Sequence, residues 1–80
     1  LTARIDTCLR AQSTYTHVIN GRFKGGYITR HYADPARGIE AVQLEMAQCT
    51  YMDEDSFAWR DDLARPVQSI LHALLAAALA

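Results

Sequence analysis

The chain has 80 residues, with 8 Lys and Arg against 9 Asp and Glu, and half of its residues are hydrophobic. This near-neutral charge gives no indication of a nucleic-acid partner, and the apolar content argues against a disordered chain. Its two cysteines are too few for a disulfide scaffold, which favours a reduced, cytoplasmic protein. A lone core of this size would be marginal, and the chain starts at Leu1 with no initiator methionine or secretory signal. We therefore expect residues 1–80 to be a fragment of a larger domain.

The first twenty residues predict a helix followed by a strand. Apolar residues in the segment 1–12 recur at the offsets i, i+4, i+7 and i+8, which place them on one helical face: Leu1, Ile5, Cys8 and Leu9. Residues 15–20 read YTHVIN and are rich in β-branched and aromatic side chains, so they predict a strand.

A glycine-rich loop follows at residues 20–26, which read NGRFKGG. Its three glycines allow positive φ angles, which predicts an irregular loop. The next segment, 27–32, reads YITRHY and suits either a strand or a short helix. The Asp34-Pro35 pair then predicts a turn, and Gly38 restarts the chain.

Residues 39–47 are the clearest predicted strand. Val42, Leu44 and Met46 alternate onto one face, while the other face carries Ala41, Gln43, Glu45 and Ala47. Apolar and small residues on the two faces predict an interior strand covered on both sides. The polar side chains of Gln43 and Glu45 are unusual on a face that is otherwise alanine.

The C-terminal third predicts a long helix. The acidic cluster that ends in Ser56 is a suitable helix start, and the pattern is helical from there to Ala80. The apolar stripe of this helix is formed by Leu63, Val67, Ile70, Leu71 and Leu74. Pro66 either belongs to the first turn of the main helix or kinks it. The apolar end from 74 to 80 is too short to span a bilayer, so no membrane partner is expected. Phe57 and Trp59, which precede this helix, are expected to anchor it to the body of the domain. The order helix, strand, loop, strand, helix fits an α/β layer arrangement.

Glu45 is the first candidate for chemistry. A carboxylate on a buried strand face costs several kcal/mol unless it is paired, hydrogen-bonded or protonated, and such costs are often tolerated where the group acts as a general base or acid or as a metal ligand. The alternative is a structural glutamate that reaches solvent or pairs with an arginine.

The basic loop is the second candidate. Arg22 and Lys24 add positive charge to a glycine-rich backbone, and Arg30 follows on the next element. The planar guanidinium fork of arginine fits a carboxylate, so this region is a plausible anion site. It matches no known phosphate-loop pattern, and the alternative is a solvated basic loop. His31 could shuttle a proton or lie on an exposed surface turn.

Neither the histidines nor the cysteines have the spacing of a metal site. The histidines stand at 17, 31 and 72, with no H-x-x-E or H-E-x-x-H pattern and no cysteine pair at ligand spacing. His17 reads as a satisfied strand residue. The fragment alone is therefore expected to bind no zinc.

The motif NGRFKGGYITRHY at 20–32, followed by AVQLEMAQCTYM at 41–52, resembles the C-terminal end of the N-formylglutamate amidohydrolase family. The resemblance covers roughly residues 15 to 75 and is far longer than a short motif. One departure is Ala33, where the family often has glycine, and it affects only the local turn.

The resemblance implies a zinc-carboxypeptidase-like, three-layer α/β/α domain, of which residues 1–80 would be the C-terminal part. It favours a short helix at 27–32 and implies that Glu45 is the general base that activates water bound to Zn²⁺ or another divalent metal. Arg22 and Arg30, with Lys24 third, would bind N-formyl-L-glutamate, which is hydrolysed to formate and L-glutamate in histidine degradation. The metal ligands would lie upstream, so the fragment, whose partner is the rest of its domain, would be inactive alone.

Two alternatives remain at this point. A related amidohydrolase would act on another N-acyl amino acid, and a substrate panel would separate the two. A non-catalytic helical interaction module would use the apolar tail from Ile70 to Ala80 against a partner. Such a module needs no carboxylate on an inner strand, so an exposed Glu45 would favour it.

Overall fold

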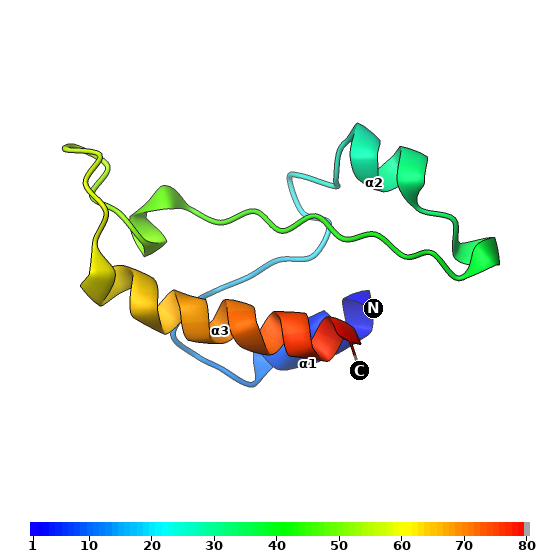
Figure 1. The fold of residues 1–80 in the computed structure, drawn as a ribbon, viewed down its shortest axis with the longest axis horizontal. Coiled ribbons are helices and arrows are strands. Elements are labelled where there is room, and N and C mark those ends of the chain that lie inside the picture. The colour runs from blue at the N-terminus through cyan, green and yellow to red at the C-terminus, as the bar shows by residue number, and fades with distance from the viewer. Residues whose placement is uncertain (80) are drawn as a thin grey trace. The chain divides into compact units, whose positions relative to one another are not determined.

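The computed structural model describes residues 1–79, and Ala80, the last residue of the predicted C-terminal helix, lies outside them. These residues form three α-helices and two short 3-10 helices (Figure 1): α1 (Thr2–Arg10), α2 (Tyr27–Tyr32), η1 (Pro35–Arg37), η2 (Gln48–Thr50) and α3 (Asp61–Leu79). The chain divides into two compact units, Leu1–Leu44 and Glu45–Ala80. The helices predicted near the N-terminus, at 27–32 and in the C-terminal third are thus confirmed, with one corrected boundary.

Helix α1 is the first element of the first unit, and Asp6 stabilises it through an ion pair on its surface. The guanidinium Nε of Arg10 donates to Asp6 Oδ2 at 2.7 Å, one helical turn away. Such i,i+4 pairs stabilise a helix modestly. The helix ends at Arg10, and the amide of Gln12 then donates to the carbonyl oxygen of Leu9.

The strands predicted at 15–20 and 39–47 are not formed within residues 1–79. The β contacts that the described chain makes are two isolated bridges, Asp34 with Ile39 and Met52 with Trp59. A strand is stabilised by the ladder that it shares with a neighbour, so an alternating segment without a partner stays an extended coil. The expected interior strand is therefore corrected to an exposed segment, in which Val42, Leu44 and Met46 are 41%, 52% and 44% exposed. The α/β class of a larger domain stays a prediction.

A tight turn links α2 to this extended segment. Pro35 occupies the first position of η1, and Gly38 has the left-handed φ of 78° that ends the turn. The amide of Asp34 donates to the carbonyl oxygen of Ile39 at 2.8 Å, and the reverse hydrogen bond measures 2.9 Å. The turn predicted from Asp34-Pro35 and Gly38 is confirmed.

The long helix begins at Asp61 rather than at Ser56. Oδ1 of Asp53 accepts hydrogen bonds from the amides of Asp55 and Ser56, at 2.8 and 3.0 Å, which makes a side-chain turn instead of a first helical turn. Phe57 then takes a positive φ of 62°, which no α-helix accommodates. The acidic residues of the first turn are instead Asp61 and Asp62.

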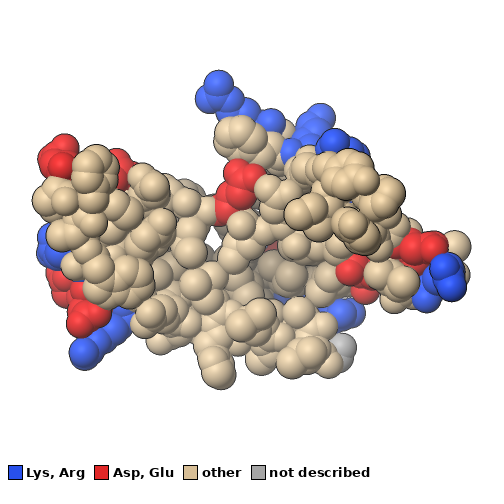
Figure 2. Space-filling view, turned by 45° about the horizontal axis from the view of Figure 1, so that its top comes forward, with Lys and Arg blue, Asp and Glu red and all other residues tan. Residues whose placement is uncertain are grey.

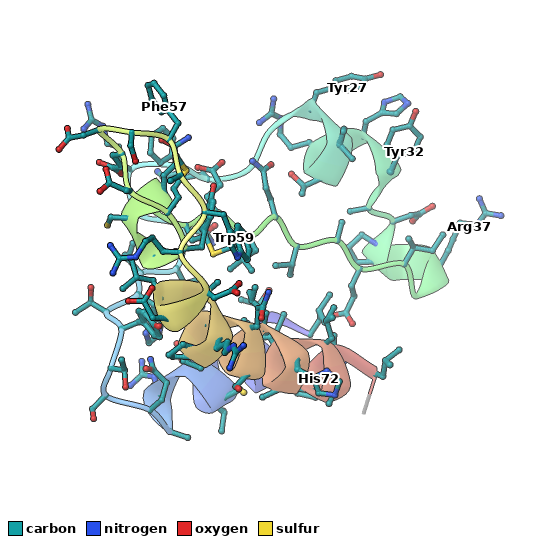
Figure 3. All side chains as sticks on the ribbon, turned by 60° about the vertical axis from the view of Figure 1, so that its left-hand side comes forward. Tyr27, Tyr32, Arg37, Phe57, Trp59 and His72 are labelled. Carbon is teal, nitrogen blue, oxygen red and sulfur yellow. The ribbon has the colours of Figure 1, made fainter. Side chains whose placement is uncertain are left out.

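The expectation that Phe57 and Trp59 anchor α3 is wrong for Phe57, whose side chain is 78% exposed and projects outward from its loop (Figure 3). The Trp59 ring lies 5.8 Å from that of Tyr51, and its indole Nε1 donates to Asp61 Oδ1 at 2.6 Å. Trp59 therefore ties the loop to the start of α3 although it is itself exposed.

Helix α3 continues through Pro66 to Leu79 and contacts η2 within the second unit. Its buried residues are Ala64, Val67 and Leu74, at spacings typical of one helical face. Pro66 lies in the second turn, where its missing amide costs one hydrogen bond without ending the helix. Within residues 1–79, no helix combines the length and apolar content that crossing a bilayer requires.

Candidate functional site

The candidate site is centred on a turn that only glycine fits. Gly25 has a φ of 87°, a region that residues with a Cβ rarely adopt. A Cβ at this position would lie 2.6 Å from the hydroxyl oxygen of Thr29. Gly26, by contrast, has extended backbone angles and is the residue from which α2 starts. The loop predicted at 20–26 is confirmed, and the positive φ of Gly25 explains the first glycine of the pair that ends it.

Three side chains hold this glycine turn. The Thr29 hydroxyl donates to the carbonyl oxygen of Gly26, and Nη1 of Arg30 donates to that of Gly25, both at 2.9 Å. The third contact comes from far along the sequence, because the Gly26 amide donates to Oε1 of Gln43 at 2.9 Å. The unusual polar residue of the alanine face therefore has a partner.

The three predicted substrate-binding cations lie on this loop and on α2. Arg22 and Lys24 are exposed, and within residues 1–79 neither has a hydrogen-bond or ion-pair partner. Arg30 is also exposed but uses one of its five N–H donors on Gly25. The first unit thus carries two uncommitted cations on the loop and a third, on α2, that is partly structural.

Glu45 is exposed and is the first residue of the second unit. The expectation of a buried carboxylate is therefore wrong in this structure, because the whole segment 39–47 that carries it is exposed. The first unit contains the three cations and the second contains the predicted base. The catalytic role of Glu45 stays a prediction.

Helix α2 also presents an exposed aromatic group. The His31 ring stacks on that of Tyr27 with centroids 4.7 Å apart, and it meets the Tyr32 ring edge-on at 4.8 Å. Both tyrosines project outward from the helix in Figure 3. His31 is thus an exposed surface residue, which agrees with the second of the two predictions made for it.

A charged cluster surrounds Asp6 and was not predicted from the sequence. Nε2 of His17 lies 2.9 Å from Asp6 Oδ1, and Arg10 occupies the other carboxylate oxygen. The hydrogen bond to His17 first, and that to Arg10 second, hold the pKa of Asp6 below its usual value. An open hollow of about 610 Å³ adjoins the cluster, and none of the predicted site residues lines it. The i,i+4 spacing of Asp6 and Arg10 could have predicted their ion pair, but nothing in the sequence predicted the contact with His17.

A zinc ion does not fit the residues that the structure describes. Across residues 1–79, no three His, Cys, Asp or Glu side chains are grouped so that they could hold a metal ion. A zinc site needs three or four such donors.

On the face in Figure 2, charged side chains of both signs stand in separate small groups between wide uncharged areas.

Comparison with known proteins agrees with the motif at 20–32. Residues 1–52 match the N-formylglutamate amidohydrolase family. Over 81 aligned positions, the chain is 53% identical to N-formylglutamate deformylase of Pseudomonas aeruginosa PAO1 and 56% identical to the protein of the same name from Pseudomonas putida. Each alignment includes all of this chain, which spans 30% of the length of these curated relatives. No solved structure matches the chain.

Proposed function

Because the chain belongs to the N-formylglutamate amidohydrolase family, we propose that the protein containing it hydrolyses N-formyl-L-glutamate to formate and L-glutamate. The observation that carries the proposal is the identity of 53–56%, over the whole chain, to two proteins named N-formylglutamate deformylase. A role in histidine degradation, which the resemblance implies, and a cytoplasmic location, which the two cysteines favour, stay predictions.

Substrate charge supports this assignment. N-formyl-L-glutamate carries two carboxylates at neutral pH, so its site needs cations. Arg22 and Lys24 have no partner in residues 1–79, and a guanidinium can hold a carboxylate through two parallel hydrogen bonds. In the proposed complex, Arg22 binds one carboxylate, while Arg30 adds charge from α2 and keeps the turn in place.

Glu45 is the proposed general base. Its carboxylate accepts a proton from the water that attacks the formyl carbon and delivers that proton to the amine nitrogen as the C–N bond breaks. The formic acid released then gives up its proton, which leaves formate and the ammonium form of L-glutamate. The metal dependence implied by the resemblance is part of the proposal. Its donors would be residues other than 1–79, since the described residues do not fit the ion.

One observation favours the non-catalytic alternative. Glu45 is exposed, which is the feature expected of an interaction module rather than of a buried base. The extended segment 39–47 is equally exposed throughout, however, so the exposure of Glu45 belongs to the whole segment and does not single out its carboxylate. We therefore give the family match and the identity to named enzymes more weight.

The test is formate release by the purified natural protein that contains this sequence. N-formyl-L-glutamate is compared with N-formyl-L-glutamine, which has the same size and one carboxylate fewer, and with N-acetyl-L-glutamate. We expect N-formyl-L-glutamate to have the highest kcat/KM, and dialysis against a chelator to abolish turnover. The 80-residue chain alone should release no formate. Absence of turnover by the natural protein on N-formyl-L-glutamate would overturn the proposal.

A further inference from the structure

We propose that Gln43 is a positioning residue of the deformylase site. Its side-chain oxygen holds the Gly26 amide, and through Gly26 it fixes the basic loop that carries Arg22 and Lys24. This inference rests on the proposed function, because it assigns to those cations the binding of substrate carboxylate. It adds a residue that touches neither substrate nor reacting atoms and acts through the loop.

The geometry shows why the loop needs such a residue. The first amides of a helix have no acceptor within the helix, and the N-cap residue that precedes α2 is Gly26, which has no side chain to cap it. Gly25 and Gly26 are also the residues with the most conformational freedom to lose. The acceptor that completes the turn comes from Gln43, 17 residues later, at 2.9 Å.

The two other contacts of the turn cannot replace this one. Thr29 and Arg30 belong to α2 itself, and they donate to the carbonyl oxygens of Gly26 and Gly25. They therefore fix the turn to its own helix. Gln43 alone among these three accepts from an amide, and it lies on the extended segment, so it joins that segment to the loop.

The Gln43 side chain also suits its position because it is uncharged. An amide oxygen satisfies the Gly26 N–H group without adding negative charge beside the cations. A glutamate there would accept the same hydrogen bond, but its charge would compete with the substrate carboxylate for Arg22 and Lys24. Gln43→Glu should therefore keep the hydrogen bond to the Gly26 amide but weaken substrate binding.

The experiment compares Gln43→Met, Gln43→Glu and the control Gln68→Met in the natural protein. Gln68 is an exposed glutamine of α3, outside the candidate site. Amide hydrogen exchange at Gly26 reports the hydrogen bond, and KM and kcat for N-formyl-L-glutamate report the site. Loss of one hydrogen bond of ordinary net strength corresponds to a factor of about ten.

In Gln43→Met we expect Gly26 exchange to accelerate about tenfold and KM to rise about tenfold, while kcat changes less than about threefold. Gln43→Glu should keep the slow Gly26 exchange of the wild type and still raise KM. Gln68→Met should resemble the wild type in all three quantities. If Gln43→Met does not fold, Gln43→Asn replaces it, because its side chain is one methylene shorter and withdraws the amide oxygen from Gly26. Faster Gly26 exchange together with a raised KM then carries the proposal, and faster exchange with an unchanged KM overturns it.

Two failures are distinguishable. A wild-type protein that is inert toward N-formyl-L-glutamate overturns the proposed function, and the positioning role with it. An active wild type whose Gln43→Met variant keeps the wild-type KM, or loses kcat alone, overturns only the positioning role.

Discussion

Nη1 of Arg30 donates a hydrogen bond of 2.9 Å to the carbonyl oxygen of Gly25, so the cation of α2 supports the turn that precedes its own helix. Arg22, on the other side of that turn, has no such contact within residues 1–79. The two arginines carry the same charge and lie in the same unit, but one is partly structural. Substitution of each arginine can distinguish the structural role from the proposed substrate-binding role.

Arg22→Gln should raise the KM for N-formyl-L-glutamate by about tenfold to a hundredfold, the range for loss of a hydrogen bond to a charged group. Its melting temperature should stay within about 2 °C of wild type, because an exposed side chain without a partner contributes little to folding. Arg30→Gln should raise KM and also lower the melting temperature, since the Gly25 carbonyl loses its donor.

Arg65→Gln, an exposed change on α3, is the matched control for the arginine variants and should leave KM unchanged. Equal effects of Arg22→Gln and Arg30→Gln on both KM and melting temperature would contradict the distinction.

Glu45→Gln should lower kcat by at least about 10²-fold, the lower end of the range for general-base catalysis, with a smaller change in KM. Glutamine keeps the size and polarity of the side chain but cannot accept the proton. The control is Glu54→Gln, at an exposed carboxylate of the loop before α3, which should behave as the wild type. A near-normal kcat in Glu45→Gln would remove this residue from the mechanism.

Gly25→Ala and Gly26→Ala should differ although they are adjacent and chemically identical. Alanine at Gly25 would take a left-handed φ and bring its Cβ within 2.6 Å of Thr29 Oγ1. We expect it to lower the free energy of unfolding by about 1–2 kcal/mol from the backbone alone. At Gly26 the nearest atom to a new Cβ is Gln43 Oε1 at 3.6 Å, an ordinary contact, so the loss should be smaller. Denaturant unfolding of the natural protein measures both, and equal losses would show that the positive φ is not required.

The Asp6 cluster should respond to acid in a defined direction. The pKa of Asp6 is held below its usual value of 3.8, so the ionised carboxylate favours the folded contacts. That stabilisation is fully present above the usual pKa and is lost as pH falls through the lowered one. Carboxyl-carbon NMR titration should show the Asp6 midpoint rising in His17→Ala and, by less, in Arg10→Ala.

Arg37→Ala is the control for this titration, because Arg37 faces Asp34 and should leave the Asp6 midpoint unchanged. An Asp6 midpoint that is the same in wild type and His17→Ala would show that the imidazole contact does not bias this carboxylate.

The helices could be predicted because their signals are local. The spacing of Leu1, Ile5 and Cys8 describes a face of α1 without reference to the rest of the chain, and the stripe of α3 does the same. The start of α3 was misplaced because aspartate and serine serve turns as well as helix caps, and Asp53 makes a turn. The strands depended on partners that residues 1–79 do not supply, which no alternation pattern can reveal.

The sequence predicted three cations on the glycine loop and on the element after it, but not the contacts of that loop. Arg22, Lys24 and Arg30 were recognisable from charge beside glycine, and the family motif assigned them a role. The hydrogen bond from Gly26 to Gln43 crosses 17 positions, so the sequence showed only a polar residue in an apolar setting. The exposure of Glu45 follows from the strand pairing that residues 1–79 do not form, and it could not be predicted from the sequence either.

The bare segment from Glu40 to Met46 also has a practical consequence for work with the isolated chain. Its extended backbone, beside the exposed and alternating side chains of Val42, Leu44 and Met46, offers a template on which identical peptides can stack. Concentrated samples of the 80-mer are therefore expected to aggregate through this segment, and Leu44→Lys should improve solubility more than Leu75→Lys on α3.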